Sequence, residues 1–225
     1  MRRLRRVASP TPGNRIALLQ NGERYFPALE AAIDAAIREI YLESYIFEND
    51  DTGRRIAAAL RRAAQRGIAT HLLLDGFGSR TLAPEVVEGL RHAGVRVLFY
   101  RPELGRWRLR RHRLRRLHRK LAVVDGETAF IGGINIIDDR DTPGQIPPRF
   151  DYAVQVQGPL VAEIACAAKH LWGLVAWSQL KRRSLPKRET RETRETLNMS
   201  EHPPPSGDTR GVFLIRDNLR HRHDI

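Results

Sequence analysis

Cysteine and methionine are scarce in this chain of 225 residues, which holds one cysteine and two methionines. A single thiol excludes an internal disulfide, and the apolar neighbours of Cys166 predict a small buried side chain rather than a catalytic nucleophile. Long apolar runs are missing too, because no window offers the ~18 consecutive apolar residues of a membrane-spanning helix. The basic first residues are followed by proline and glycine, so neither a cleavable signal nor a membrane anchor is predicted there.

Negative charge is also in short supply. The chain has 26 acidic residues against 39 lysines and arginines, which gives a formal net charge of +13. Such an excess favours nucleic acid, an anionic lipid surface or a phosphorylated substrate as partner, and composition does not choose among them. The segment 101–120 concentrates the charge, with nine arginines, one lysine and one glutamate. We expect this segment to attract phosphates or to contact an anionic membrane, with a solvated basic loop as the alternative.

Strand and helix patterns alternate through the first hundred residues. Strands are predicted at 14–20, 40–47, 68–75 and 95–100, and helices at 25–40, 52–67 and 83–94. The first of these helices has apolar residues at the amphipathic spacing Phe26, Leu29, Ile33, Ile37 and Ile40. Alternation of this kind predicts an α/β fold with a mixed, mostly parallel sheet flanked by helices.

The pattern changes after the basic run. Two apolar segments joined at Asp125 and Gly126 predict an antiparallel hairpin, residues 149–159 alternate as a strand, and 160–177 read as a closing helix. Three consecutive "RET" triplets within 179–210 fit neither period, which indicates a disordered linker. Residues 211–225 resemble the first strand and turn. We therefore expect a basic tail at 1–13, one domain at 14–178, a low-complexity linker at 179–210, and the start of a truncated second repeat at 211–225.

The stretch "LHRKLAVVDGETAFIGGIN" contains ionisable residues where a core hairpin favours apolar ones. His118 and Lys120 are two apart on a strand and share a face. A neighbouring cation favours the neutral imidazole, which can attack phosphorus, and an ammonium neutralises the charge that develops on phosphoryl oxygens. An exposed strand face without chemistry is the alternative reading of this pair.

Four further residues fit the same chemistry. Asp125 at the turn can accept hydrogen bonds and hold the arrangement, and Asn135 adds a neutral donor. Gly132 and Gly133 let a phosphate approach the backbone. Together these residues suit a phosphodiester substrate.

"HRKLAVVD" fits the HxKxxxxD pattern of the phospholipase D superfamily, and "GGIN" fits the GxxN extension that follows it there. With "YLESYIF", "LLLDGFGS" and "RFDYAVQVQGP", residues 14–178 resemble bacterial cardiolipin synthases. The resemblance implies that His118 is a nucleophile forming a phosphohistidine, that Lys120 and Asn135 bind phosphate, and that Asp125 completes the catalytic motif as support. It also implies a substrate such as phosphatidylglycerol. Because no signal or membrane-spanning run is predicted, we expect a cytoplasmic protein that associates peripherally with the inner face of the cell membrane.

Other positions refine this resemblance. Gly133 stands where nuclease members commonly carry serine, which favours the lipid branch. Asp151 is similar to the family's acidic residue that orients a histidine across the site. Glu43 either points toward the site or pairs with an arginine, and Asp75 is undecided between such roles. The residues call for no cofactor and no metal.

The sequence departs from the family in containing one such motif, where members use two. The segment with His221, His223 and Asp224 lacks the lysine, and a metal site there is the weaker reading of a solvated tract. A second copy of the chain or a separate half-chain would have to supply the second histidine. The alternatives are a dimeric phosphodiesterase or nuclease, and an inactive basic module that binds anionic membrane or nucleic acid.

Overall fold

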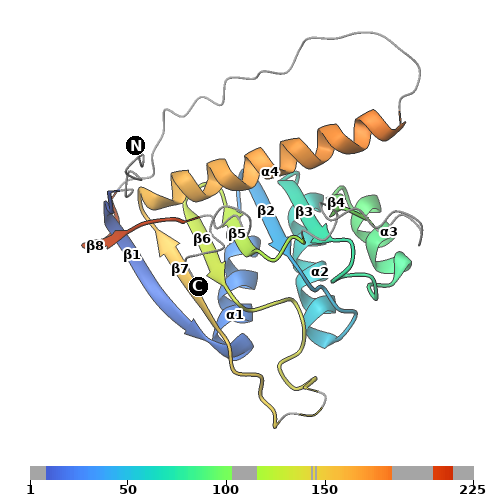
Figure 1. Cartoon of the computed structure of the whole chain (residues 1–225), viewed down its shortest axis with the longest axis horizontal. Helices are drawn as coiled ribbons and strands as arrows, with labels where there is room; N and C mark the ends of the chain where they lie inside the picture. The colour runs from blue at the N-terminus through green and yellow to red at the C-terminus, as the bar shows by residue number, and fades with distance from the viewer. Residues whose placement is uncertain (1–8, 103–115, 143, 145, 184–204, 215–225) are drawn as a thin grey trace, which may run out of the picture.

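The computed structural model describes residues 9–102, 116–142, 144, 146–183 and 205–214. They form an eight-stranded sheet in the order β4-β3-β2-β5-β6-β7-β1-β8 (Figure 1). The strands are β1 (Thr11–Gln20), β2 (Glu39–Ser44), β3 (Ala69–Asp75), β4 (Arg96–Tyr100), β5 (Lys120–Val124), β6 (Thr128–Gly132), β7 (Tyr152–Gln157) and β8 (Thr209–Gly211). The helices are α1 (Asn21–Ala35), α2 (Asp51–Gln65), α3 (Pro84–His92) and α4 (Leu160–Arg183).

The predicted mixed α/β sheet flanked by helices is confirmed, but the balance of strand directions differs from the prediction. Only β2–β3 and β3–β4 pair in parallel among the described strands, whereas β2–β5, β5–β6, β6–β7, β1–β7 and β1–β8 are antiparallel. Helical crossovers produce the parallel pairs, and the hairpin between β5 and β6 produces antiparallel ones. The sheet is therefore mostly antiparallel.

Helices cover both faces of the sheet. The first three pack on one face around a large apolar core that includes Leu29, Ile33, Leu60 and Phe130. Helix α4 crosses the other face and covers a second cluster (Figure 1). Alternation along the strands explains the division, because Ala122 and Val124 of β5 belong to the first core whereas Leu121 and Val123 belong to the second.

Helix α1 is shorter at its end than the apolar spacing predicts. It ends at Ala35, Ile37 is 72% exposed, and Ile40 is buried in β2. The amides of Ile37, Arg38 and Glu39 all donate to the Asp125 carboxylate, which holds this segment extended as it enters β2. A tertiary hydrogen-bond acceptor thus overrides the local helical pattern.

The predicted hairpin turn is confirmed. Asp125 and Gly126 both have positive φ, +56° and +69°, as the two central residues of a type I′ turn require. This turn matches the right-handed twist of the flanking strands, and it fixes the register that pairs Lys120 with Gly132.

The secondary structure extends a few residues beyond both ends of the predicted domain 14–178. The domain boundaries themselves stay predictions. Strand β1 begins at Thr11, helix α4 continues to Arg183, and Gly211 of β8 pairs with Thr11. Most of the basic segment 101–120 and of the linker 179–210 lies outside the described residues. Cys166 is half-buried rather than buried.

One helical segment in the described part of the chain, Leu160–Gln179, is long and apolar enough by length and composition to cross a membrane. A core helix of a soluble protein passes the same test, and here Val161, Ile164 and Ala168 are buried in the cluster beneath α4.

Candidate active site

His118 and Lys120 lie at the edge of the sheet where β2 and β3 end and β5 begins. Their side chains meet: Lys120 Nζ is 3.1 Å from His118 Nε2 and donates to the His118 carbonyl at 3.3 Å. The imidazole is exposed, whereas Lys120 is only 6% exposed. The site therefore presents the imidazole to solvent and holds the ammonium buried beside it.

The surroundings of His118 favour its neutral form. Partial burial and the Lys120 charge lower the pKa of His118, and the Asp75 charge opposes them. A protonated lysine has no acceptor site, so in the close contact Lys120 donates and Nε2 accepts. The Nε2 lone pair would thus become free for another partner if the ammonium donated elsewhere.

Asp151 and Gly133 complete the surroundings of the lysine. Burial lowers the pKa of Lys120, and the charge of Asp151 raises it. The Asp151 carboxylate lies directly against Gly133, where an added Cβ would be 2.1 Å from Oδ1. The lack of a side chain at residue 133 therefore makes the space in which Asp151 sits. Tyr152 N also donates to Asp151 Oδ1 at 2.7 Å.

Asn135 belongs to the same edge through its backbone neighbours. Its Oδ1 accepts from Ile46 N at 3.1 Å, which ties it to the segment following β2. No described residue is assigned as a partner of its Nδ2, so this donor is available to a ligand. Gly132 faces Ala153 of β7 with no room for a Cβ, since that atom would lie 2.3 Å from the Tyr152 carbonyl.

Asp75, which the sequence left undecided, and Tyr45, which it did not single out, both contact the site. Asp75 is fully buried at the end of β3, and its carboxylate accepts from the amides of Leu117, Phe77 and Gly78 at 2.7–3.0 Å. It thereby fixes the backbone immediately before His118. The ring of Tyr45 lies 5.0 Å from that of His118 and 5.3 Å from Lys120 Nζ, so it forms one wall of the site.

Glu43 pairs with an arginine, which decides between its two predicted roles. Both of its oxygens accept from Arg119 at 2.8 Å, and Glu43 is 2% exposed. Burial raises the pKa of Glu43 to about 7, and the Arg119 guanidinium opposes this shift. Arg119 lies between His118 and Lys120 in the chain, so its pairing with Glu43 positions the start of β5. Within the part of the chain that the structure describes, no hydrogen bond joins this pair to the imidazole.

Asp125 is not brought to the His118 cluster. It follows the far end of β5, five residues beyond Lys120, which corresponds to roughly 17 Å of extended chain. Its oxygens accept three backbone amides at 2.7–2.9 Å. These contacts agree with the supporting place in the motif that the resemblance implies for Asp125.

The described residues contain no group of three or more histidine, cysteine, aspartate or glutamate side chains placed to hold a metal ion. His221, His223 and Asp224 lie outside the described residues. The chemistry available to the described site is that of an imidazole, an ammonium and a carboxamide at one sheet edge.

A family model described as "Cardiolipin synthase, PLD-like domain" matches residues 29–145, which include the whole hairpin with His118, Lys120 and Asn135. The chain belongs to this family of phospholipase D-like domains. The predicted resemblance is therefore confirmed. Cardiolipin synthase B of Escherichia coli is 38% identical over 214 residues, covering 95% of this chain and 49% of that protein. The chain spans about half the length of the curated relatives it matches.

Solved structures confirm the phospholipase D-like fold. The phospholipase D family member Nuc of Salmonella typhimurium aligns with a TM-score of 0.53 at 17% identity, over 71% of this chain and 95% of that one. Phosphatidylserine synthase of Haemophilus influenzae aligns with a TM-score of 0.53 at 15% identity, over 70% of this chain and 37% of that one. At these identities the likeness concerns the fold alone.

Proposed function

We propose that the chain carries the nucleophilic half of a phosphatidyltransferase of the cardiolipin-synthase type, acting on phosphatidylglycerol. The observation that supports this most directly is the pairing of an exposed imidazole with a buried ammonium, Nε2 to Nζ, at 3.1 Å. The names of the relatives that match 95% of the chain agree with it.

In the first step, His118 Nε2 forms a bond to phosphorus as the bond from phosphorus to the glycerol oxygen breaks. Lys120 and the Asn135 Nδ2 donate to the phosphoryl oxygens as charge builds on them. The departing oxygen takes a proton from a general acid, which we assign to the second histidine of a partner subunit or half-chain. In the second step a hydroxyl of another phosphatidylglycerol attacks phosphorus and frees the imidazole.

The net charge of +13 supports a location at an anionic surface, and we propose peripheral binding at the cytoplasmic face of the cell membrane. A metal-independent phosphodiesterase acting on nucleic acid would use the same imidazole and ammonium. The space that Gly133 leaves for Asp151 supports the lipid reading over the nuclease one, because a serine side chain would enter that space.

The test is a turnover assay with anionic vesicles of phosphatidylglycerol, run beside metal-free DNA nicking, together with native mass measurement. We expect cardiolipin to form only where a partner or a second copy is bound, and to be lost in His118→Ala. DNA nicking lost in the same variant would replace the proposal by the nuclease function. Salt-sensitive membrane binding that is unchanged in His118→Ala, with neither activity, would indicate an inactive binding module.

A further inference from the structure

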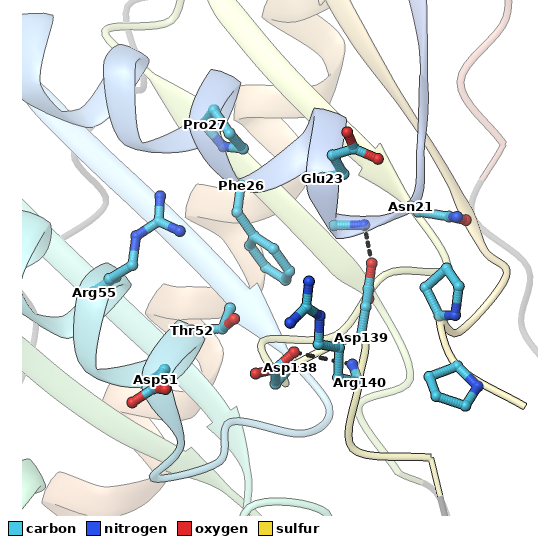
Figure 2. Close-up of a pocket in the computed structure, with 13 residues that line it drawn as sticks. Asn21, Glu23, Phe26, Pro27, Asp51, Thr52, Arg55, Asp138, Asp139 and Arg140 are labelled. Atoms are coloured by element: carbon cyan, nitrogen blue, oxygen red, sulfur yellow. Dashed lines mark hydrogen bonds between the residues drawn. The ribbon is translucent and has the colours of Figure 1, made fainter. Parts of the chain in front are cut away.

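A cavity of about 780 Å³ lies between the start of α1, the start of α2, residues 138–140 and the pair Pro147–Pro148 (Figure 2). Phosphoryl transfer by His118 and Lys120 makes no use of it. Its size falls within the range of sites for small ligands. Figure 2 shows the ring of Phe26 projecting from α1 toward the loop that carries Asp138 and Arg140.

The cavity adjoins the catalytic edge through Asp151. Asn21, which lines the cavity, exchanges two hydrogen bonds with Asp151: its amide donates to the Asp151 carbonyl at 2.8 Å, and its Oδ1 accepts from Asp151 N at 3.1 Å. The charge of Asp151 acts both on Lys120 at the site and on Asp139 in the cavity wall. The cavity wall is thus joined by hydrogen bonds to a residue whose charge acts on Lys120.

Carboxylates dominate the charge of the cavity wall, which is unusual in a chain of net charge +13. The ionisable lining residues are Glu23, Asp51, Asp138, Asp139, Arg55 and Arg140. Arg55 is paired with Glu30 at 2.7 Å and Asp51 is paired with Arg54, which leaves Glu23, Asp138 and Asp139 against Arg140. A net negative wall repels phosphate, whereas carboxylate oxygens accept hydrogen bonds from hydroxyl groups.

Apolar surface completes the lining. Phe26, Pro27, Pro147 and Pro148 contribute carbon faces, and Thr52 contributes a hydroxyl. Carboxylates combined with flat apolar surfaces suit a polyol, because the hydroxyls donate to the oxygens and the C–H groups pack on the rings.

We propose that this cavity binds the hydroxyl-bearing headgroup of the acceptor lipid, a glycerol-type polyol. The proposal rests on the proposed function and assigns a place to its second substrate. One headgroup hydroxyl reaches the phosphohistidine, where its oxygen bonds to phosphorus, the phosphorus–Nε2 bond breaks, and the hydroxyl proton goes to the partner histidine. The remaining hydroxyl donates to the cavity carboxylates. Water can also donate to these carboxylates, but it has no C–H groups to pack on the apolar lining, so the cavity favours the polyol over water and thereby transfer over hydrolysis.

The test is amide NMR on the full chain with two short-chain lipids below their micelle concentrations, dihexanoyl phosphatidylglycerol and dihexanoyl phosphatidylethanol. Both are anionic, and they differ in the diol. We expect both to shift amides around Lys120, and phosphatidylglycerol alone to shift those of Asn21, Thr52 and Asp138. Thr52→Val and Asp138→Asn should weaken phosphatidylglycerol binding by about 3- to 10-fold each, the effect of losing one hydrogen bond. Glu88→Gln, an exposed carboxylate on α3, is the control and should leave binding unchanged.

Equal shifts of the cavity amides by both lipids, or no shift by either, would overturn the proposal. Free glycerol forms a third arm: shifts at the same amides, absent around Lys120, would support a polyol site that does not depend on the lipid phosphate. If neither lipid shifts the amides around Lys120, the proposed function is contradicted. The amides of the cavity still report on polyol binding in that case.

Discussion

At the scale of single residues, the exposed imidazole and the buried ammonium are held in contact by different parts of the chain. Lys120 is fixed by its strand pairing with Gly132, whereas His118 precedes the strand and depends on Asp75 holding the Leu117 amide. The pair is therefore pre-organised on both sides of the contact, which is where electrostatic catalysis draws its advantage.

The titration of His118 tests this contact. Burial and the Lys120 charge both lower the pKa of His118, so we expect an NMR midpoint below the ordinary value of 6.5. In Lys120→Met the charge is removed, and the midpoint should rise. Lys169→Met is the control, because Lys169 lies on α4 and pairs with Glu39 of β2. A midpoint that is the same with and without Lys120 would mean that the two groups do not interact in solution.

Glu43 makes a prediction about stability. Its pKa is about 7 in the folded state and 4.5 ordinarily, so the folded chain binds the proton more tightly than the unfolded one. Its contribution to stability is then fully present below pH 4.5 and is lost as the pH rises through about 7. We expect the unfolding free energy to fall over this window, and Glu43→Gln to flatten that fall relative to Glu88→Gln. Denaturant titrations at pH 4.5, 6 and 7.5 measure it, and equal slopes in the two variants would contradict the assignment.

At the scale of elements, the hairpin of β5 and β6 carries most of the motif and is supported from both ends. Asp125 binds the amides that lead into β2, and Asp151 of the segment before β7 sits against Gly133. The two carboxylates act on different ends of the same hairpin.

Removing the charge at Asp125 should therefore lower the stability of the fold more than it lowers the activity of the site. Asp125→Asn keeps a residue that tolerates positive φ but loses the carboxylate that binds three amides, and we expect a loss of about 2 kcal/mol of stability. Glu127→Gln, which breaks only an exposed ion pair with Arg38, should change stability by less than about 1 kcal/mol. The unfolding midpoints in urea compare them. Similar losses in both variants would show that the amide contacts contribute little.

The close packing of Gly133 and Asp151 predicts coupling between them. Gly133→Ala would drive a methyl into the Asp151 carboxylate, at about 1–3 kcal/mol for overpacking. In the Asp151→Ala background the carboxylate is gone, so the same substitution should be much less destabilising. A double-mutant cycle on unfolding free energies measures the coupling. Additive effects would mean that Asp151 does not occupy this space.

Local sequence patterns predicted the hairpin, but they could not predict the directions of the strands or the contacts between residues far apart in the sequence. Asp125 and Gly126 encode their own turn, and the two-residue spacing of His118 and Lys120 encodes a shared site. The antiparallel entry of β5 beside β2 depends on how the chain returns after β4, which no local period records. Asp75 and Tyr45 contact the site across 42 and more than 70 residues of sequence. Asp75 ends β3 and Tyr45 follows β2, and neither strand's pattern indicates which distant residue it will meet.

At the scale of the whole molecule, one layered domain brings His118, Lys120, Asp75 and Asp151 to a single edge of the sheet. The strand ends of β2, β3 and β6 and the starts of β5 and β7 gather there, with the cavity beside them. The described site holds one imidazole, so in the proposed reaction the protonation of the leaving oxygen falls to a group outside it. The proposed reaction therefore separates into a nucleophilic step that the chain performs and an acid step that a partner performs.

This separation defines the most direct measurement. A phosphatidyl ester of p-nitrophenol has a leaving group that departs without a general acid, so the chain alone should react with it. We expect intact mass analysis under alkaline conditions to find one phosphatidyl group, with peptide mapping on His118 and none in His118→Gln. An unmodified chain, or an adduct that persists in His118→Gln, would contradict covalent catalysis by this imidazole.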